Sequence, residues 1–113
     1  NIFTETKAEH STENIYYSYK KAKRLGFNRI ALASDPFQTR MLRKFTRKKV
    51  SPEVGMIPMV IDTMRAMEPG MIHPAIEFEK AYKPDFVPLT ERESFWQRFK
   101  GTQGRRLDVE AYK

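Results

Sequence analysis

The chain contains no cysteine and no long apolar run, and each absence removes a class of protein. Without cysteine there is no disulfide framework and no thiolate chemistry, although the cytoplasm and the cell envelope both stay open as locations. The longest apolar stretch, residues 54–61, is interrupted by Gly55 and Pro58 and is shorter than the roughly 20 residues that span a bilayer. We therefore expect no membrane-spanning helix here. Because the chain begins with Asn1, we expect it to be the remainder of a longer polypeptide.

Histidine and the common catalytic motifs are also scarce. His10 and His73 are the only histidines, and neither has a ligand partner at metal spacing, so we expect no metal site. The sequence has no GxGxxG, Walker, GxSxG, CxxC or HExxH pattern. The standard dinucleotide, P-loop, hydrolase and zinc functions therefore lack support.

What the sequence does have is a local excess of positive charge. The chain has 113 residues, 40% of them hydrophobic, which suits one small globular domain. Its net charge of +7 is concentrated in residues 20–49, which hold 11 Lys or Arg and one acid, Asp35. We call residues 20–49 the basic segment. It suits an anionic ligand, nucleic acid or an anionic lipid surface, or it forms the solvated faces of ordinary helices.

Apolar spacing in the first half of the chain predicts two helices. The first ends at Gly26, and the second begins at the N-cap Asp35 with Pro36 in its first turn. The first apolar stripe consists of Ile15, Tyr19, Ala22 and Leu25, and the second of Phe37, Met41, Leu42 and Phe45. We expect both stripes to face a core.

Short apolar runs between these helices predict strands. Residues 30–33 form a continuous apolar run typical of a strand covered on both faces, residues 2–4 suit the tail of another strand, and residues 54–61 suit a third. Ser51 and Pro52 end the second helix. The resulting β-α-β-α-β order predicts a layered α/β fold with mainly parallel strands.

The second half of the chain is interrupted by prolines. Four of them between residues 63 and 88 predict an extended segment with short helices, followed by a capping box at residues 90–93 that opens an aromatic helix. We expect residues 101–113 to be a polar, frayed tail. We expect the domain to comprise residues 1–62, with residues 63–113 forming its proline-rich excursion and terminal helix.

Two segments place polar residues where ligands bind in α/β folds, at the carboxyl ends of strands. Residues 5–14 carry carboxylates, hydroxyls and an amide before a helix start, which suits an anion as well as simple capping by Ser11 or Thr12. After the strand at residues 30–33, Arg40 is placed to clamp a phosphate or carboxylate, or it belongs to the solvent-exposed basic face. The candidate ligand-binding residues are Glu5, Ser11, Glu13, Asn14, Ser34, Gln38 and Arg40.

In order and spacing these segments resemble the YdcF-like domain family, which includes the SanA and ElyC envelope proteins. The family pattern runs E-x-x-S-x-N-T-x-E-N, then a helix, a glycine, a hydrophobic strand and T-S-x-x-H-x-x-R. The matching residues are Glu5, Ser11, Glu13, Asn14, Gly26, Ser34 and Arg40. The departures are Ala8 for Ser, His10 for Asn, Ala33 for Thr and Phe37 for His. The likeness covers residues 2–61, and the family's N-terminal strand and glycine-rich turn have no counterpart.

The resemblance implies a Rossmann-like three-layer fold of which this chain would be the C-terminal half. It implies a bacterial protein of the cell envelope, membrane-anchored or periplasmic, or of the cytoplasm, in a family linked to peptidoglycan and lipid-carrier metabolism, to vancomycin tolerance and, in one branch, to binding S-adenosylmethionine. The partners it implies are a small anionic ligand, the missing N-terminal half, and a membrane contacted through an absent N-terminal anchor. Because Phe37 replaces the family histidine, we favour ligand binding over catalysis.

Two functions follow as expectations. The first is a YdcF-like domain that binds a polar anionic ligand such as S-adenosylmethionine or a lipid-carrier phosphate, whether or not it is an enzyme. The second, ranked lower, is a nucleic-acid or anionic-membrane binding module that uses the basic segment. With Tyr19, Phe37 and Phe45 assigned to the core, the basic segment has no exposed aromatic residues between its charges, which counts against nucleic acid.

Overall fold

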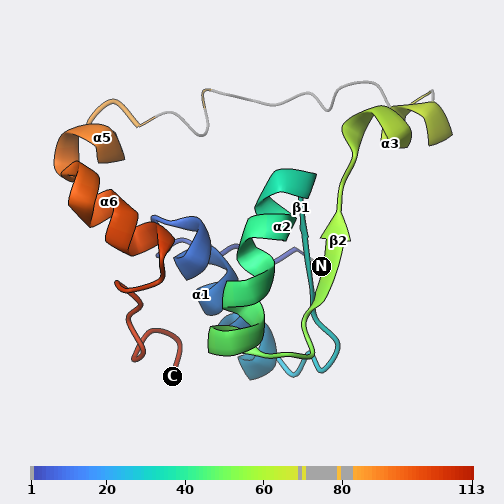
Figure 1. Cartoon of the computed structure of the whole chain (residues 1–113), viewed down its shortest axis with the longest axis horizontal. Helices are drawn as coiled ribbons and strands as arrows, with labels where there is room; N and C mark the ends of the chain where they lie inside the picture. Colours follow the sequence, from blue (N-terminus) through green and yellow to red (C-terminus); the bar gives the residue numbers. More distant parts are fainter. Residues whose placement is uncertain (1, 69, 71–78, 80–82) are drawn as a thin grey trace.

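The computed structural model describes residues 2–68, 70, 79 and 83–113 (Figure 1). Helices and strands alternate through its first half and short helices follow in its second. In chain order the elements are α1 (Ser11–Arg24), β1 (Ala31–Ser34), α2 (Pro36–Phe45), the π-helical turn η1 (Thr46–Val50), β2 (Gly55–Pro58), α3 (Ile61–Met67), α5 (Leu89–Arg92) and α6 (Phe95–Thr102).

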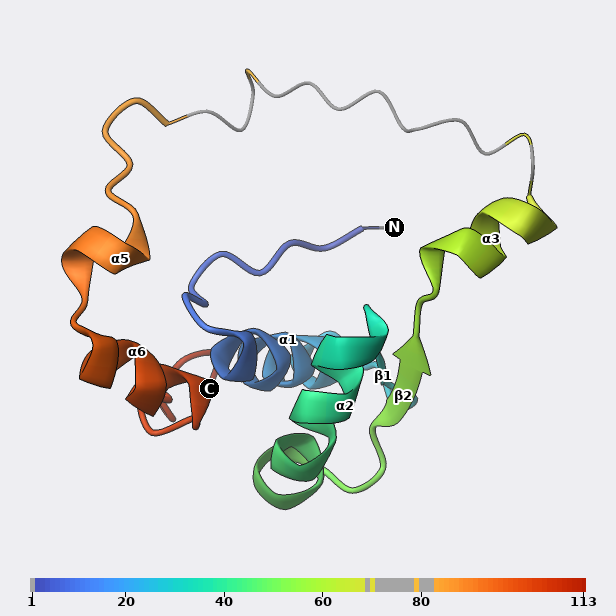
Figure 2. The same cartoon turned by 45° about the horizontal axis from the view of Figure 1, so that its top comes forward.

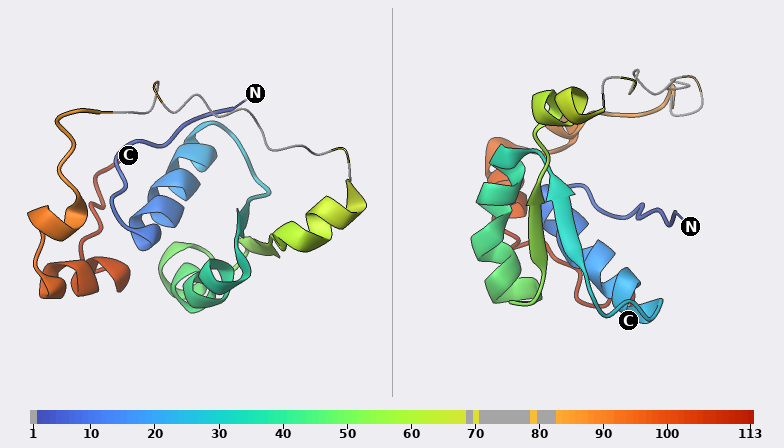
Figure 3. Two further views of the ribbon diagram at one scale, coloured as in Figure 1. Left: turned by 90° about the horizontal axis from the view of Figure 1, so that it is seen from above. Right: turned by 90° about the vertical axis from the view of Figure 1, so that its right-hand side faces the viewer.

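The sheet consists of two parallel strands joined through α2. Ala31 pairs with Gly55 and Ser34 with Pro58, so β1 and β2 lie in full register. Gly55 approaches Ala31 so closely that a Cβ added to it would lie 3.3 Å from the Ala31 Cβ. Figure 3 shows α2 alongside the two strands. The predicted parallel α/β arrangement is confirmed at this coarse level, a mixed fold with a two-stranded parallel sheet.

The helix after β1 begins as the sequence predicts. The Asp35 carboxylate accepts hydrogen bonds from the backbone N–H groups of Phe37 and Gln38, both at 3.0 Å, and Pro36 occupies the first turn. These contacts satisfy donors that a helix start leaves free. After Phe45 the chain widens into η1 and ends in the extended residue Ser51.

The core of the described residues is small. Ile15 of α1, Leu42 of α2 and Val54 before β2 form a buried cluster, with Tyr19 and Leu32 packed against it. Two residues of the predicted second stripe stand outside it, because Phe37 is 67% and Met41 is 49% exposed. The assignment of Phe37 to the core is therefore wrong. Spacing alone identifies a helix face but not the width of the surface that covers it.

Residues 2–4 form no strand, so the first strand of the predicted order is absent from the described residues. The capping box also differs from the prediction. Ser94 caps α6, with its hydroxyl accepting from the Gln97 N–H and the Gln97 side chain accepting from the Ser94 N–H, whereas residues 90–92 lie within α5. Of the proline-rich segment, residues 69, 71–78 and 80–82 lie outside the described residues.

The C-terminal tail packs against α1 instead of fraying. The Tyr17 hydroxyl accepts a hydrogen bond from the Asp108 N–H at 2.9 Å, and Lys20 Nζ donates to the Val109 carbonyl at 2.6 Å. Ala111 is only 3% exposed. Figure 2 shows the C-terminal end of the chain near α1 and α6. Hydrogen bonds with Tyr17 and Lys20 of α1 therefore hold a tail whose own composition is polar.

Candidate anion-binding groove

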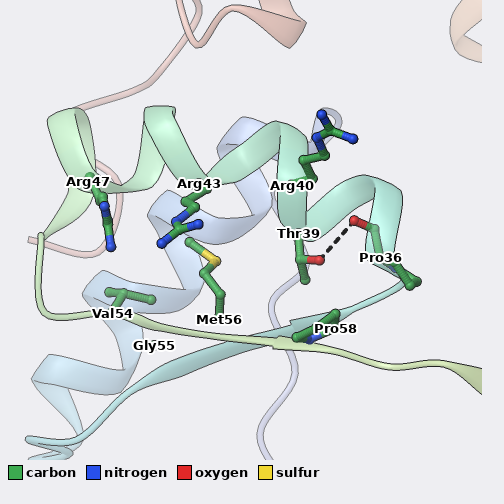
Figure 4. Close-up of a pocket in the computed structure, with 9 residues that line it drawn as sticks. All are labelled: Pro36, Thr39, Arg40, Arg43, Arg47, Val54, Gly55, Met56 and Pro58. Atoms are coloured by element: carbon green, nitrogen blue, oxygen red, sulfur yellow. Dashed lines mark hydrogen bonds between the residues drawn. The ribbon is translucent and has the colours of Figure 1, made fainter.

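A groove of about 460 Å³ lies between α2 and β2 (Figure 4). We call it the arginine groove because three arginines line it. Its lining consists of Pro36, Thr39, Arg40, Arg43, Arg47, Val54, Gly55, Met56 and Pro58.

The three arginines come from one side of one continuous helical segment. Arg43 follows Arg40 by three residues and Arg47 follows Arg43 by four, a spacing that places side chains on the same helix face. In Figure 4 the guanidinium groups of Arg43 and Arg47 extend toward β2 near Val54 and Met56, whereas that of Arg40 is turned away from the strand. The groove thus has two inward cations and a third at its rim.

No carboxylate neutralises these arginines within the described part of the chain. The ion pairs there join other residues, and Asp35, five residues before Arg40, is engaged in capping α2. A guanidinium offers five N–H donors in a planar fork that fits carboxylate and phosphate oxygens. An anionic ligand would therefore supply the charge that the protein lacks in the arginine groove.

Two polar residues of α2 complete this region. Thr39 is 4% exposed, and its hydroxyl lies 3.1 Å from each of the carbonyls of Asp35 and Pro36, so it holds the first turn of the helix. Gln38 Oε1 is buried and has no hydrogen-bond partner among residues 2–68, 70, 79 and 83–113. Ser34 ends β1, where its carbonyl accepts from the Met59 N–H at 2.7 Å.

The other predicted set, at the start of α1, is occupied by the protein's own groups. The Glu5 carboxylate accepts from the N–H groups of Lys7 and Ala8 and from the Tyr112 hydroxyl. Burial by itself would raise the pKa of Glu5, but the hydrogen bonds from Lys7, Tyr112 and Ala8 outweigh it and hold the pKa below its ordinary value. Glu13 is buried and accepts from the Glu9 N–H at 2.9 Å.

The N-cap of α1 is His10, and no side chain caps this helix. Neither predicted cap, Ser11 or Thr12, caps the helix. Ser11 is already within α1, and the Thr12 hydroxyl donates to the Gly101 carbonyl of α6 at 2.5 Å. Asn14 is exposed, and its Oδ1 accepts from Ser18 at 3.2 Å. This end of α1 is therefore a packing site for α6 and the tail.

The structure divides the seven predicted residues into two groups. Glu5, Ser11, Glu13 and Asn14 lie at the start of α1, and no hydrogen bond or ion pair of the described residues links them to the group near α2. Of the second group only Arg40 lines the arginine groove. Arg43 and Arg47 were not among the candidate residues, although Arg43 follows Arg40 by three positions and Arg47 follows Arg43 by four, a spacing that marks a single cationic row.

A buried cluster of ionisable residues joins α1 to α6 and was not predicted. His10 Nε2 lies 3.3 Å from Glu93 Oε2, and Arg106 pairs with the other oxygen of Glu93. The side chains of His10 and Glu93 are 4% and 7% exposed. Because these residues come from distant parts of the chain, sequence spacing gave no signal of their contact.

Comparison with protein families, with curated proteins and with solved structures finds no match for this chain. Among residues 2–68, 70, 79 and 83–113 no helix is long and apolar enough to cross a bilayer. Within the same residues no three His, Cys, Asp or Glu side chains gather as metal ligands would.

Proposed function

We propose that this chain binds a small anionic ligand in the arginine groove, with Arg43 and Arg47 holding its phosphate or carboxylate and Arg40 guiding it at the rim. The observation that carries the proposal is a cavity lined by three arginines that have no carboxylate partner in the described residues. A volume of about 460 Å³ is within the range of small-molecule sites. A nucleotide-sized ligand fits these dimensions.

The YdcF-like affiliation and the Rossmann-like three-layer fold are part of the same proposal. In such a fold the ligand lies beyond the carboxyl ends of the strands, here Ser34 and Pro58, and Pro58 lies at the Arg40 end of the groove. Arg43 and Arg47 extend the site from that end along β2 toward Val54. The ligand classes that the resemblance suggests are S-adenosylmethionine and lipid-carrier phosphates, in bacterial cell-envelope biogenesis. Both carry an anionic group that an arginine can hold.

A three-layer fold needs further strands beside β1 and further helices on its sheet. The pairs Ala31 with Gly55 and Ala33 with Ile57 share the sheet face opposite α2, and all four residues are exposed. Parallel sheets occur almost only with both faces covered. These exposed pairs support a partner segment, the N-terminal half of the domain, that completes the sheet.

Ligand binding is tested by thermal-shift and titration measurements with S-adenosylmethionine, nucleotides and a polyprenyl phosphate. We expect at least one of them to stabilise the chain. We expect Arg43→Gln to lower the affinity for that ligand by about tenfold, because one charge-assisted hydrogen bond is lost. Arg29→Gln removes the same charge from an exposed loop and serves as the matched control. Equal losses from both variants, or no stabilisation by any ligand, would refute the proposal.

A specific observation favours nucleic acid as the second candidate. Phe37 and Met41 are exposed on the side of α2 that also carries Arg40 and Lys44, so the basic segment does present an aromatic residue among its charges. Aromatic side chains beside cations are the usual means of holding single strands. Binding of a labelled oligonucleotide that weakens steeply with salt and is lost in Phe37→Ser would select this function over the first.

A further inference from the structure

Helix α6 presents its aromatic side to solvent. Successive helix residues are about 100° apart, so Phe95, Trp96 and Phe99 fall within one arc of about 100°. They are 65%, 68% and 43% exposed. Gly101, on the other side, lies so close to His10 that a Cβ added to it would overlap the His10 ring. The helix therefore packs its smallest residue inward and its largest outward, the reverse of an ordinary core helix.

The three rings form one continuous apolar surface, which we call the aromatic face. The ring centroids of Phe95 and Trp96 are 5.7 Å apart, those of Trp96 and Phe99 are 6.2 Å apart, and those of Phe95 and Phe99 are 6.4 Å apart. Figure 1 shows α6 at the end of the molecule away from the sheet. No described element covers the aromatic face.

The charged residues of α6 and of the turn after it have one sign. Residues 94–107 contain four Arg or Lys and no Asp or Glu. On the helix, Arg98 and Lys100 flank the aromatic arc on its two sides. The acid that precedes α6, Glu93, is turned inward and pairs with His10 and Arg106. The surface that faces solvent here is thus apolar at its centre and cationic at its margins.

Buried contacts fix α6 in this orientation. Thr12 donates its hydroxyl to the Gly101 carbonyl at 2.5 Å, and the Glu93 side chain lies against His10 just before the helix begins. The capping box of Ser94 and Gln97 defines the first turn. These contacts hold α6 in place, so the aromatic face is exposed in the folded chain without any opening of the structure.

We infer that the aromatic face is a docking site for an anionic lipid surface. Trp and Phe are the side chains that settle at the boundary between headgroups and acyl chains, and adjacent Arg and Lys attract anionic headgroups. A single exposed tryptophan between two cations matches that chemistry, whereas a positively charged partner would be repelled. The inference does not depend on a ligand in the arginine groove.

Trp96 is the only tryptophan of the chain, so its fluorescence reports this surface alone. The full chain is titrated with vesicles of phosphatidylcholine and with equimolar phosphatidylcholine and phosphatidylserine. We expect a blue shift and an intensity gain with the anionic vesicles, reduced by added salt because the charges are exposed. No shift with the anionic vesicles, or an equal shift with both kinds, would overturn the inference.

Matched variants locate the contact by vesicle co-sedimentation. We expect the double variant Phe95→Ser, Phe99→Ser to weaken anionic-vesicle binding by about tenfold or more, because two aromatic rings no longer enter the membrane. Lys100→Glu should also weaken it, while Phe37→Ser removes an equally exposed ring, 67% against 65%, from α2 and should leave it unchanged. Far-UV circular dichroism confirms that each variant is folded. Wild-type binding by both α6 variants, or an equal loss in Phe37→Ser, contradicts the site.

Discussion

Tyr112 anchors the C-terminal tail despite a backbone conformation that tyrosine rarely adopts. Its φ of 58° lies in the left-handed region, which costs free energy for a residue with a Cβ. The contacts that offset this cost are the hydrogen bond from its hydroxyl to Glu5 at 2.9 Å and the ammonium group of Lys7, 4.6 Å from the ring centre. Glu5 therefore links the N-terminal segment to the tail.

The Glu5 contacts make part of the stability depend on pH. Hydrogen bonds hold the folded-state pKa of Glu5 below its ordinary value of 4.5. The carboxylate therefore stabilises the fold fully above that ordinary value, and the contribution is lost as pH falls through the lowered folded-state pKa. We expect Glu5→Gln to be less stable than wild type at pH 7.

Urea unfolding at several pH values checks this expectation. Asp108→Asn serves as the control, because the Asp108 carboxylate accepts a hydrogen bond from the Glu110 N–H two residues away. The difference between wild type and Glu5→Gln should shrink as the pH falls below the ordinary pKa of 4.5 and through the lowered folded-state pKa. A difference that stays constant with pH would show that the amide fails for steric reasons and not through the lost charge.

At the scale of single elements, the cap of α2 is the contact that the sequence predicted most completely. The Asp35 carboxylate satisfies two backbone donors, so we expect Asp35→Ala to destabilise the chain by about 1 kcal/mol. Asp35→Asn should recover most of the loss, because Asn caps about as well. Denaturant unfolding measures both variants. Equal destabilisation by Ala and Asn would show that charge, and not hydrogen bonding, is what the helix requires.

Helices that are marked by short-range sequence patterns, such as apolar spacing or an N-cap, were predictable from the sequence. Contacts between segments far apart in the chain were not. The spacing of Ile15 and Tyr19 located α1, and Asp35 located the start of α2. In contrast, the pairing of His10 with Glu93 joins residues 83 positions apart and carries no local signal. The arginine groove was predicted only in part, since Arg40 was a candidate while Arg43 and Arg47 were not, because their position beside β2 depends on the tertiary fold.

For the whole molecule, two apolar surfaces of the described residues are open to solvent. The first is the sheet face with Ala33 and Ile57, and the second is the aromatic face of α6. They suit different partners, since only the second is flanked by cations.

The open sheet face gives a direct test of this description. Ile57 is 52% exposed and Val54, three residues earlier, is 6% exposed in the core. In the chain alone we expect Ile57→Asp to change the free energy of unfolding by less than about 0.5 kcal/mol, as at other surface positions. Val54→Asp buries a charge and should cost several kcal/mol or prevent folding, of the order known for uncompensated buried charges.

Denaturant unfolding compares the two variants, and sedimentation shows whether the chain is monomeric while it is measured. If Ile57→Asp is as damaging as Val54→Asp in a monomer, the face is covered by the chain itself and no partner segment is needed. If the damage appears only where the wild type associates, a second copy covers the face. If Ile57→Asp is harmless in a monomer, the side chain of Ile57 is open to solvent. It then remains available to the strands and helices that would complete a three-layer domain.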